Sequence, residues 1–333
     1  MKKIFSFCLT LVLLAGLLTG CGTASDTSAP NTQTKSLHIV TTIFPTYDWV
    51  RTVLGEQADN AEITFLLDNG VDMHSYQPSA EDIMKISSCD VFVYAGGESD
   101  AWASDALKNA SNKNMQVINL LDVLGEHAKE EETVEGMQGA DDHEHGSGKP
   151  SEEEPEYDEH VWLSLKNAQL FVSAIADSLS QADIAHADAY AANAVAYNKQ
   201  LAQLDAAYQS AVDAAPIKTV LFADRFPFRY LVDDYGLSYY AAFSGCSADT
   251  QASFDTIIFL ADKVNELGLH SILTIENSDD KIANTIIQNT QSRDQQVRTL
   301  NSMQTVTSND LASGTTYLSI MKENLSVLSA ALQ

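Results

Sequence analysis

Four side chains in this 333-residue sequence combine metal-binding chemistry with positions where a ligand site could form. His74 lies in a turn-rich stretch just before Ser79, which could cap a helix, and His160 lies where an acidic stretch gives way to apolar residues. Asp224 and Glu276 each directly follow a short β-rich run. Two imidazoles facing two carboxylates would make a closed site for a divalent cation. We therefore treat these four residues as candidate metal ligands.

Each of the four residues also has a purely structural explanation. A single histidine in a loop is more often hydrogen-bonded than bound to metal, and His160 could pair with Asp158. A carboxylate that follows a strand frequently caps the next helix. The metal interpretation therefore requires that the four side chains meet in space.

A second group of histidines lies in an acidic segment. Residues 126–159 carry fourteen acidic residues against two lysines, together with four glycines and two prolines, and this composition predicts a mobile insertion. Within the segment, the stretch DDHEH at 141–145 could weakly collect zinc, copper or nickel, or it could simply be solvated. We regard His143 and His145 as accessory candidates for metal binding.

No catalytic motif in the sequence is convincing. The chain contains no His-Glu-x-x-His, no Gly-x-Ser-x-Gly, no phosphate-binding glycine-rich loop and no dinucleotide fingerprint. The small-residue turn at 244–247, which contains Cys246, could expose a nucleophile, but no base stands at a recognisable spacing from it. A turn is the preferred interpretation.

The N-terminus has the features of an export signal. Two lysines precede an apolar run at 4–18, which is shorter than the roughly 20 residues that span a bilayer. The run ends in Leu-Thr-Gly-Cys, which looks like the lipobox of bacterial lipoproteins. Cleavage there would make Cys21 a lipidated N-terminus and hold the protein on the outward-facing side of the cell membrane. An ordinary secretory signal is the alternative. Residues 22–36 lack large apolar side chains and predict a flexible tether.

Two further properties restrict the class of protein. The sequence has 46 acidic residues against 19 lysines and arginines, a net charge of −27, which argues against a nucleic-acid partner. Cys89 and Cys246 remain beyond the lipobox, and export would permit a disulfide between them, although two free thiols fit the sequence equally well.

The elements that must position the candidate ligands alternate between strand and helix, a pattern typical of parallel sheets covered by helices. Strands are expected at 37–44, 61–67, 90–95, 115–120, 218–222, 237–243, 271–275 and 296–300. Helices are expected at 47–54, 79–86, 100–108, 226–235, 253–267, 279–291 and 315–332. Residues 183–214 are rich in alanine and contain no glycine or proline, so they predict one helix. Such a helix is long enough to run along both lobes.

The predicted fold class is therefore α/β, with two lobes that each contain a mainly four-stranded parallel sheet, joined by one long rigid helix. The expected organisation is a signal peptide at 1–20, a lipidated cysteine and tether at 21–36, an N-terminal lobe at 37–166 that includes the insertion at 126–159, a linking helical segment at 167–215 and a C-terminal lobe at 216–333.

Three motifs carry a resemblance to a known family. They read TTIFPTYDW at 41–49, MHSYQPS at 73–79 and DEHVWLS at 158–164. With the lipobox, they are similar to the zinc- and manganese-binding solute receptors of metal ABC importers, over essentially the whole mature chain. The resemblance implies two α/β lobes joined by a rigid helix, one metal ion between the lobes, and delivery of that ion to a membrane permease.

The resemblance places His74 and His160 at the family's first two metal ligands. The family's third ligand, normally a His or Glu, falls on Arg225 when counted back from the Tyr-Gly-Leu at 235–237. A guanidinium cannot coordinate a cation. We therefore expect Asp224, one residue away, to replace it.

The family's fourth ligand has no clear counterpart either. The corresponding stretch begins at Asn301 and reads Asn-Ser-Met, without Asp, Glu or His. Glu276, at the end of the neighbouring strand, is our substitute, with Cys246 as the next candidate after it.

The preferred hypothesis is a lipid-anchored, monomeric receptor outside the cytoplasm that binds Zn²⁺, with Mn²⁺ as the second choice, and hands it to an ABC permease. Such a receptor makes and breaks no bond, so it is not an enzyme. The alternatives are a surface-anchored zinc hydrolase with Glu276 as its base, or an adhesin on the same scaffold. Sites of histidine and carboxylate accept several metals, and the sequence does not choose among them.

Overall fold

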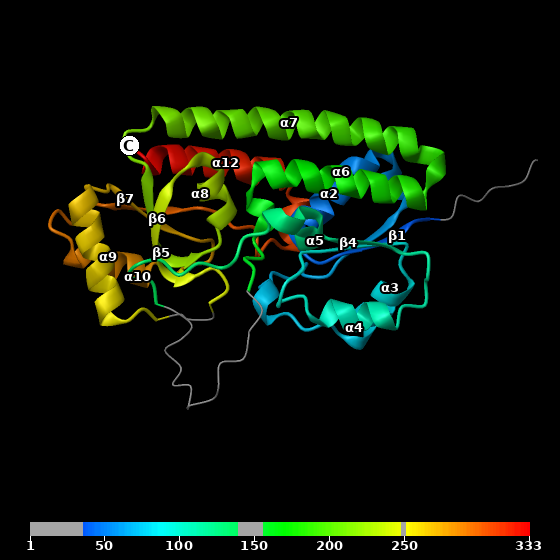
Figure 1. Cartoon of the computed structure of the whole chain (residues 1–333), viewed down its shortest axis with the longest axis horizontal. Coiled ribbons are helices and arrows are strands. Elements are labelled where there is room, and N and C mark those ends of the chain that lie inside the picture. The colour runs from blue at the N-terminus through cyan, green and yellow to red at the C-terminus, as the bar shows by residue number, and fades with distance from the viewer. Residues whose placement is uncertain (1–35, 139–155, 248–250) are drawn as a thin grey trace, which may run out of the picture. The chain divides into compact units, whose positions relative to one another are not determined.

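Two parallel β-sheets organise the computed structural model, which describes residues 36–138, 156–247 and 251–333 (Figure 1). The first sheet has the order β2-β1-β3-β4 and the second the order β6-β5-β7-β8, with parallel neighbours throughout. The strands are β1 (His38–Thr41), β2 (Glu62–Phe65), β3 (Val91–Tyr94), β4 (Gln116–Asn119), β5 (Thr219–Phe226), β6 (Ser238–Ser244), β7 (Ser271–Thr274) and β8 (Gln296–Thr299). Each overlaps its predicted range, and the predicted fold class is confirmed.

Helices cover both faces of the first sheet. The helix α2 (Phe44–Leu54) follows β1 with a proline in its first turn, and α6 (Leu165–Ala182) packs against β3 and β4. On the other side, α3 (Ala80–Ser88) packs against β1 and α4 (Trp102–Lys108) packs against α3. The short α5 (Leu120–Leu124) follows β4 and contacts α6.

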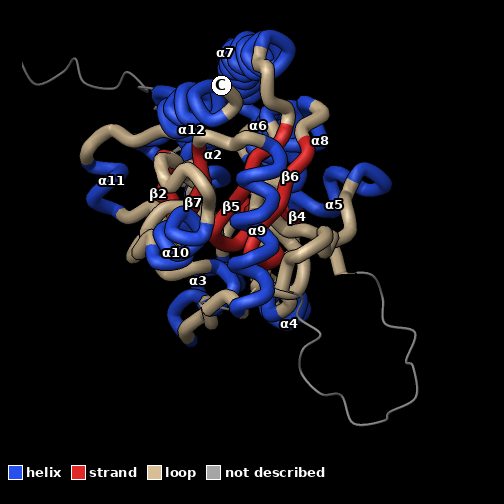
Figure 2. The backbone as a smooth tube through the Cα atoms, turned by 90° about the vertical axis from the view of Figure 1, so that its left-hand side faces the viewer, coloured by secondary structure: helices blue, strands red, loops and turns tan. Residues whose placement is uncertain are grey.

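The second sheet is covered in the same way. Figure 2 shows α9 (Phe254–Leu267) and α10 (Lys281–Asn289) lying together over its strands, where they contact β6, β5 and β7. The helix α12 (Tyr317–Ala331) packs against β7 and β8, while α8 (Arg229–Tyr235) and the short α11 (Ser308–Ala312) complete the lobe. The helix α9 ends at Gly268, which takes the left-handed conformation (φ 64°) that glycine favours.

One long helix connects the lobes, as predicted, and a second helix packs across both of them. The long helix α7 (Ala187–Ala214) packs against α2 and α6 of the first lobe and against α8 and α12 of the second (Figure 1). The predicted helix from residue 183 is therefore confirmed over most of its length, but it begins later because the short 3-10 helix η6 (Ile184–His186) precedes it. Its counterpart α12 also crosses to the first lobe, where it contacts α2.

The apolar core continues from one lobe into the other. Trp49 of α2 meets Tyr317 of α12 edge to face, with ring centroids 5.0 Å apart. The Tyr317 backbone N–H donates to Asp48 at 3.0 Å, and the Tyr317 hydroxyl donates to the carbonyl of Trp162 at 2.7 Å. Burial of this aromatic cluster fixes the lobes against each other more firmly than a flexible hinge would. A smaller apolar cluster, which includes Leu260, lies between the second sheet and its outer helices.

One strand is longer than predicted. Strand β5 continues through Asp224 and Arg225 to Phe226, and its register with β6 shifts between Phe222 and Arg225. This bulge keeps the backbone paired although the apolar pattern is interrupted. The predicted helix from Phe226 consequently begins only at Arg229.

The two ends of the acidic segment are packed, which corrects the prediction of a mobile insertion for 126–138 and 156–159. Glu130 forms an antiparallel bridge with Tyr157, and the Gln138 N–H donates to the carbonyl of Ala242 in β6 at 2.9 Å. Met137 is buried. Composition could not reveal this packing, because the partners of the segment lie elsewhere in the sequence.

Several predicted features lie outside the described residues. These are the signal peptide, the lipidated Cys21, the tether up to residue 35, and the pair His143 and His145. Within the described part of the chain, no helix is both long enough and apolar enough to cross a membrane.

Candidate metal centre

The two predicted histidines meet at one point in the fold. His74 lies in the 3-10 helix η2 (Met73–Ser75) after β2, and Asp72 caps that turn by accepting the His74 backbone N–H at 3.0 Å. His160 lies just before the 3-10 helix η5 (Val161–Leu163). Although 86 residues separate them in the chain, their Nε2 atoms are 3.2 Å apart. That distance is close to the separation of about 3.3 Å between two nitrogens that bind one tetrahedral zinc ion.

His160 is fully buried and held by Asp158. Its Nδ1 lies 2.9 Å from Asp158 Oδ1, and the same oxygen accepts the His160 backbone N–H at 2.8 Å. Because a carboxylate oxygen accepts hydrogen bonds, Nδ1 of His160 donates to Asp158. This bond turns Nε2 toward His74 and leaves it as the ring nitrogen that could take a metal ion.

His74 is held in a comparable way by different groups. Its Nδ1 lies 2.8 Å from the hydroxyl of Ser99 and 3.7 Å from Oε2 of Glu159. Burial lowers the pKa of His74 to about 3, the facing His160 and the nearby Arg225 act in the same direction, and Asp72 opposes them. His74 is therefore neutral near pH 7, the form that coordinates a metal.

The groups around His74 differ in how far their hydrogen bonds are satisfied. Its Nε2 lies 3.2 Å from Nε2 of His160, so one hydrogen bond can join the two rings. Oε2 of Glu159 is buried without a hydrogen-bond partner. The other oxygen of Glu159 is occupied, because it accepts the Ser99 backbone N–H at 2.7 Å. Burial raises the pKa of the Glu159 carboxyl, although the bonds from Ser99 oppose that effect.

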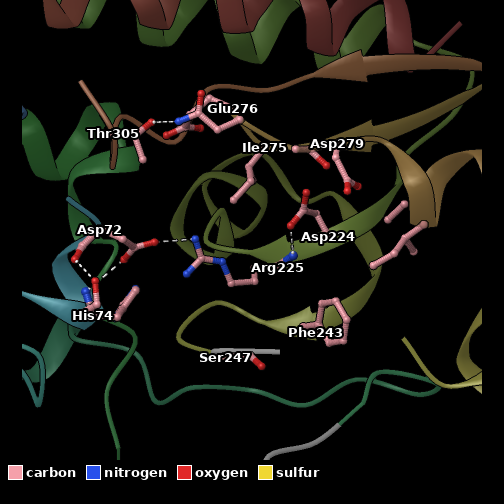
Figure 3. A pocket seen from close by; sticks show the side chains of 15 residues that line it. Asp72, His74, Asp224, Arg225, Phe243, Ser247, Ile275, Glu276, Asp279 and Thr305 are labelled. Atoms are coloured by element: carbon pink, nitrogen blue, oxygen red, sulfur yellow. Dashed lines mark hydrogen bonds and ion pairs between the residues drawn. The ribbon is translucent and has the colours of Figure 1, made fainter. Parts of the chain in front are cut away.

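The predicted ligands of the second lobe lie close by, on a cavity of about 530 Å³ that also reaches His74 (Figure 3). The carboxylate of Glu276 is fully engaged, since it accepts the Ser302 N–H at 2.6 Å, the Ser302 hydroxyl at 2.8 Å and the Gln304 N–H at 2.9 Å. Asp224 Oδ1 accepts the backbone N–H of Arg225 at 2.9 Å. The structure places Asp224 and Glu276 on the wall of the cavity, and neither belongs to the described group of close ligand atoms that contains the two histidines.

Arg225 has a partner from the opposite lobe. Figure 3 shows its side chain reaching toward Asp72, and Nη2 lies 2.6 Å from Asp72 Oδ2. Burial alone would raise the pKa of Asp72, but the charge and hydrogen bond of Arg225 outweigh it and hold that pKa below 3.8. The ion pair joins the two lobes beside His74.

Cys246 is the second-lobe side chain that joins the histidines. Among the described residues, a ligand atom from each of His74, His160 and Cys246 lies within 4.8 Å of the others. Burial, and then the carboxylates of Glu131 and Glu159, raise the pKa of the Cys246 thiol above its usual range. Both described cysteines are free, and Cys89 is buried elsewhere, at the end of α3.

Sequence reasoning missed three residues of this site. Glu159 and Ser99 hold His74, and Asp72 pairs with Arg225. Glu159 stands beside His160 in the sequence and could have been suspected on that ground, whereas no pattern connects Ser99 with His74. Asn301, where the resemblance led us to expect a fourth ligand, accepts the Met303 N–H at 2.8 Å and so shapes its own loop.

Comparison with known proteins adds independent information. The model of a family described as zinc-uptake complex component A, periplasmic, matches residues 39–331. The zinc-binding lipoprotein AdcA of Streptococcus pneumoniae is 32% identical over 295 residues, which cover 88% of this chain and 55% of that protein. The chain thus spans about half the length of this curated relative.

Two solved structures are similar over their whole length. The Zn(II)-bound ZnuA-like domain of Streptococcus pneumoniae AdcA is 29% identical with a TM-score of 0.68, over 89% of this chain and 99% of that domain. The laminin-binding protein Lmb of Streptococcus agalactiae, described as bifunctional with adhesin and metal-transporting activity, is 26% identical with a TM-score of 0.70, over 90% of this chain and 100% of that one.

Proposed function

Because the chain belongs to the family of periplasmic A components of zinc-uptake complexes, we propose that it is a receptor outside the cytoplasm that captures Zn²⁺ between its lobes and delivers it to an ABC permease. The match to the family model and the similarity to the zinc-bound AdcA domain support this proposal. The metal is a cargo that the receptor binds and releases.

The approach of the two Nε2 atoms carries the proposal. His74 and His160 come from segments 86 residues apart, yet their Nε2 atoms lie 3.2 Å from each other while both Nδ1 atoms are held from behind. Outer hydrogen bonds of this kind fix the ring orientation and raise ligand basicity at metal sites. Half of a tetrahedral site is therefore formed before the ion arrives.

A bound cation would replace the hydrogen bond between the two rings. Each Nε2 then gives its lone pair to Zn²⁺, and each ring carries its hydrogen on Nδ1, where Asp158 accepts it from His160 and the Ser99 hydroxyl accepts it from His74. The acceptors for both Nδ1 hydrogens are thus already in place.

A zinc hydrolase fits the site less well. Such an enzyme needs a free general base near the metal-bound water. The base nominated from the sequence, Glu276, accepts three hydrogen bonds from the loop that begins at Ser302, so its carboxylate already holds that loop in place. We therefore propose binding without turnover.

Attachment to the membrane is part of the proposal. The sequence places a lipobox cysteine, Cys21, after an apolar run, and AdcA of Streptococcus pneumoniae is described as a lipoprotein. A lipidated Cys21 would hold the receptor at the outer surface of the membrane, beside the permease.

Calorimetric titration of the whole purified chain with Zn²⁺ tests this function. We expect one tight site in the wild type and its loss in His74→Ala. The matched control is His38→Ala, because His38 is exposed and lies at the start of β1, away from the cavity. Deletion of residues 139–155 should leave the tight site in place, since none of its proposed ligands is removed. A tight site that ignores His74 and disappears with this deletion would contradict the proposal.

A further inference from the structure

The second lobe must contribute to an interlobe metal site, yet neither carboxylate predicted from the sequence is placed to do so. Both oxygens of Glu276 accept hydrogen bonds from Ser302 and Gln304. Asp224 accepts a backbone N–H with Oδ1, and neither carboxylate belongs to the described group of ligand atoms that lie within 4.8 Å of one another. The loop after β6, which carries Cys246, lies closest to the histidines instead.

That loop is held against His160 from two sides. A Cβ atom on Gly245 would lie 3.1 Å from Cε1 and 3.2 Å from Nδ1 of His160, and 3.0 Å from the carbonyl of Phe226. Only a residue without a side chain lets the loop approach the ring so closely. On the other side, the Cys246 backbone N–H donates to Glu131 at 3.1 Å, so the packed start of the acidic segment also fixes Cys246.

The resulting donor set is close to a zinc geometry. In a tetrahedral site a nitrogen and a sulfur ligand are about 3.6 Å apart. The ligand atoms of His74, His160 and Cys246 lie within 4.8 Å of one another, so a shift of roughly 1 Å in the Cys246 side chain would complete the third corner. The surrounding carboxylates, among them Glu131, Glu159 and Asp158, favour a positive ion at this point.

We propose that Cys246 is the second-lobe ligand, so that the site binds its cation through two imidazoles and a thiolate. This inference rests on the proposed metal-binding function and specifies the cargo. On binding, the sulfur–hydrogen bond breaks, its proton passes to solvent, and a sulfur–metal bond forms. Thiolate selects zinc and similar thiophilic ions and is a poor ligand for Mn²⁺, so the cargo is a thiophilic divalent cation.

Cobalt(II) is a suitable probe, because thiolate coordination gives it an intense near-ultraviolet charge-transfer band that nitrogen and oxygen ligands do not give. We expect this band when one equivalent of Co²⁺ is added to the whole, reduced protein. It should vanish in Cys246→Ser and in His74→Ala, and remain in the matched control Cys89→Ala.

Zinc affinity provides the second readout. Cys246→Ser should weaken Zn²⁺ binding by at least about 100-fold, the upper end of the loss that removal of an outer-shell partner causes. Mn²⁺ binding should change far less. Without any substitution, Zn²⁺ should also protect Cys246 of the wild type from iodoacetamide, as measured by peptide mass spectrometry, and Mn²⁺ should not.

The outcomes separate this inference from the proposed function. If the wild type binds Zn²⁺ tightly at His74 but shows no sulfur-to-cobalt band, and Cys246→Ser binds equally well, the thiolate ligand is wrong and the receptor function stands. If the wild type binds no Zn²⁺, the proposed function fails and this inference fails with it.

Discussion

The two halves of the proposed metal centre are built on different principles. In the first lobe, His74 and His160 have their Nδ1 atoms held by Ser99 and Asp158, and their Nε2 atoms already lie 3.2 Å apart. In the second lobe, the nearest proposed ligand is a partly exposed cysteine on a turn, and the neighbouring polar groups are bonded to other parts of the protein.

This difference separates affinity from selectivity. Under the proposal, the first-lobe half would bind any divalent ion that accepts imidazole, because its geometry is set before the ion arrives. The second-lobe half would decide which ion is retained, since a thiolate and a carboxylate prefer different metals. Changes in the first half should therefore lower binding of all ions, and changes in the second half should alter their order.

The largest effect is expected for His160→Ala. It removes a preformed ligand and leaves a buried oxygen of Asp158 with one hydrogen bond fewer. We expect a loss of Zn²⁺ affinity above about 100-fold and a fall in unfolding free energy of roughly 2 kcal/mol. Calorimetry and urea denaturation measure the two effects. If zinc affinity were unchanged, the histidines of the first lobe would not be the source of binding, and the contrast between the two halves would be wrong.

Asp158→Asn should have the next largest effect. The amide can no longer hold His160 as a carboxylate does, so the ring loses its fixed hydrogen position and some of its basicity. We expect Zn²⁺ affinity to fall by about 10- to 100-fold. Asp82→Asn is the matched control, since Asp82 caps α3 and contacts Tyr76 instead. Equal losses in both variants would indicate a general defect rather than a positioning role for Asp158.

Gly245→Ala tests the second-lobe half of the site. The added Cβ would meet His160 and the Phe226 carbonyl at 3.0–3.2 Å, so the loop that carries Cys246 must move away. We expect a several-fold loss of preference for Zn²⁺ over Mn²⁺, measured by competition titration, with Mn²⁺ binding little changed. A Gly236→Ala variant controls for general glycine effects, because a Cβ there has no neighbour within 4 Å.

The smallest effect concerns the ion pair between Asp72 and Arg225. Both side chains are partly exposed, so a double-mutant cycle with Asp72→Asn and Arg225→Gln should give a coupling of about 1 kcal/mol at pH 7. Because the folded-state pKa of Asp72 lies below 3.8, this stabilisation is present above that pH and is lost as the pH falls below it. Denaturation at pH 7 and at pH 3 checks the sign. A coupling energy that is larger at pH 3 than at pH 7 would exclude a stabilising ion pair between Asp72 and Arg225.

Sequence patterns predicted the fold better than the site. The eight strands were predictable because apolar β-rich runs separated by helix signals leave few alternatives, and the capping box of Ser79 with Asp82 marks the start of α3. The bulge in β5 was not predictable, since pairing with β6 carries the strand through Asp224 and Arg225. That error made Asp224 seem to stand free beyond a strand end.

The site was predictable only where a motif surrounds the ligand. His74 and His160 stand in motifs that resemble a family, and the structure brings them together. The engagement of Glu276 by Ser302 and Gln304 depends on a loop almost thirty residues further on, which no local pattern reveals. Cys246 could be noted as a candidate, but its proximity to the histidines is a property of the folded chain.

The helix α12 has a consequence for the order of biosynthesis. Tyr317 of α12 completes the aromatic cluster around Trp49 and bonds to the carbonyl of Trp162, residues made much earlier in translation. The core of the first lobe is therefore incomplete until α12 has emerged from the ribosome. A first lobe whose core waits for so distant a helix folds late, and late folding suits the export of an unfolded polypeptide.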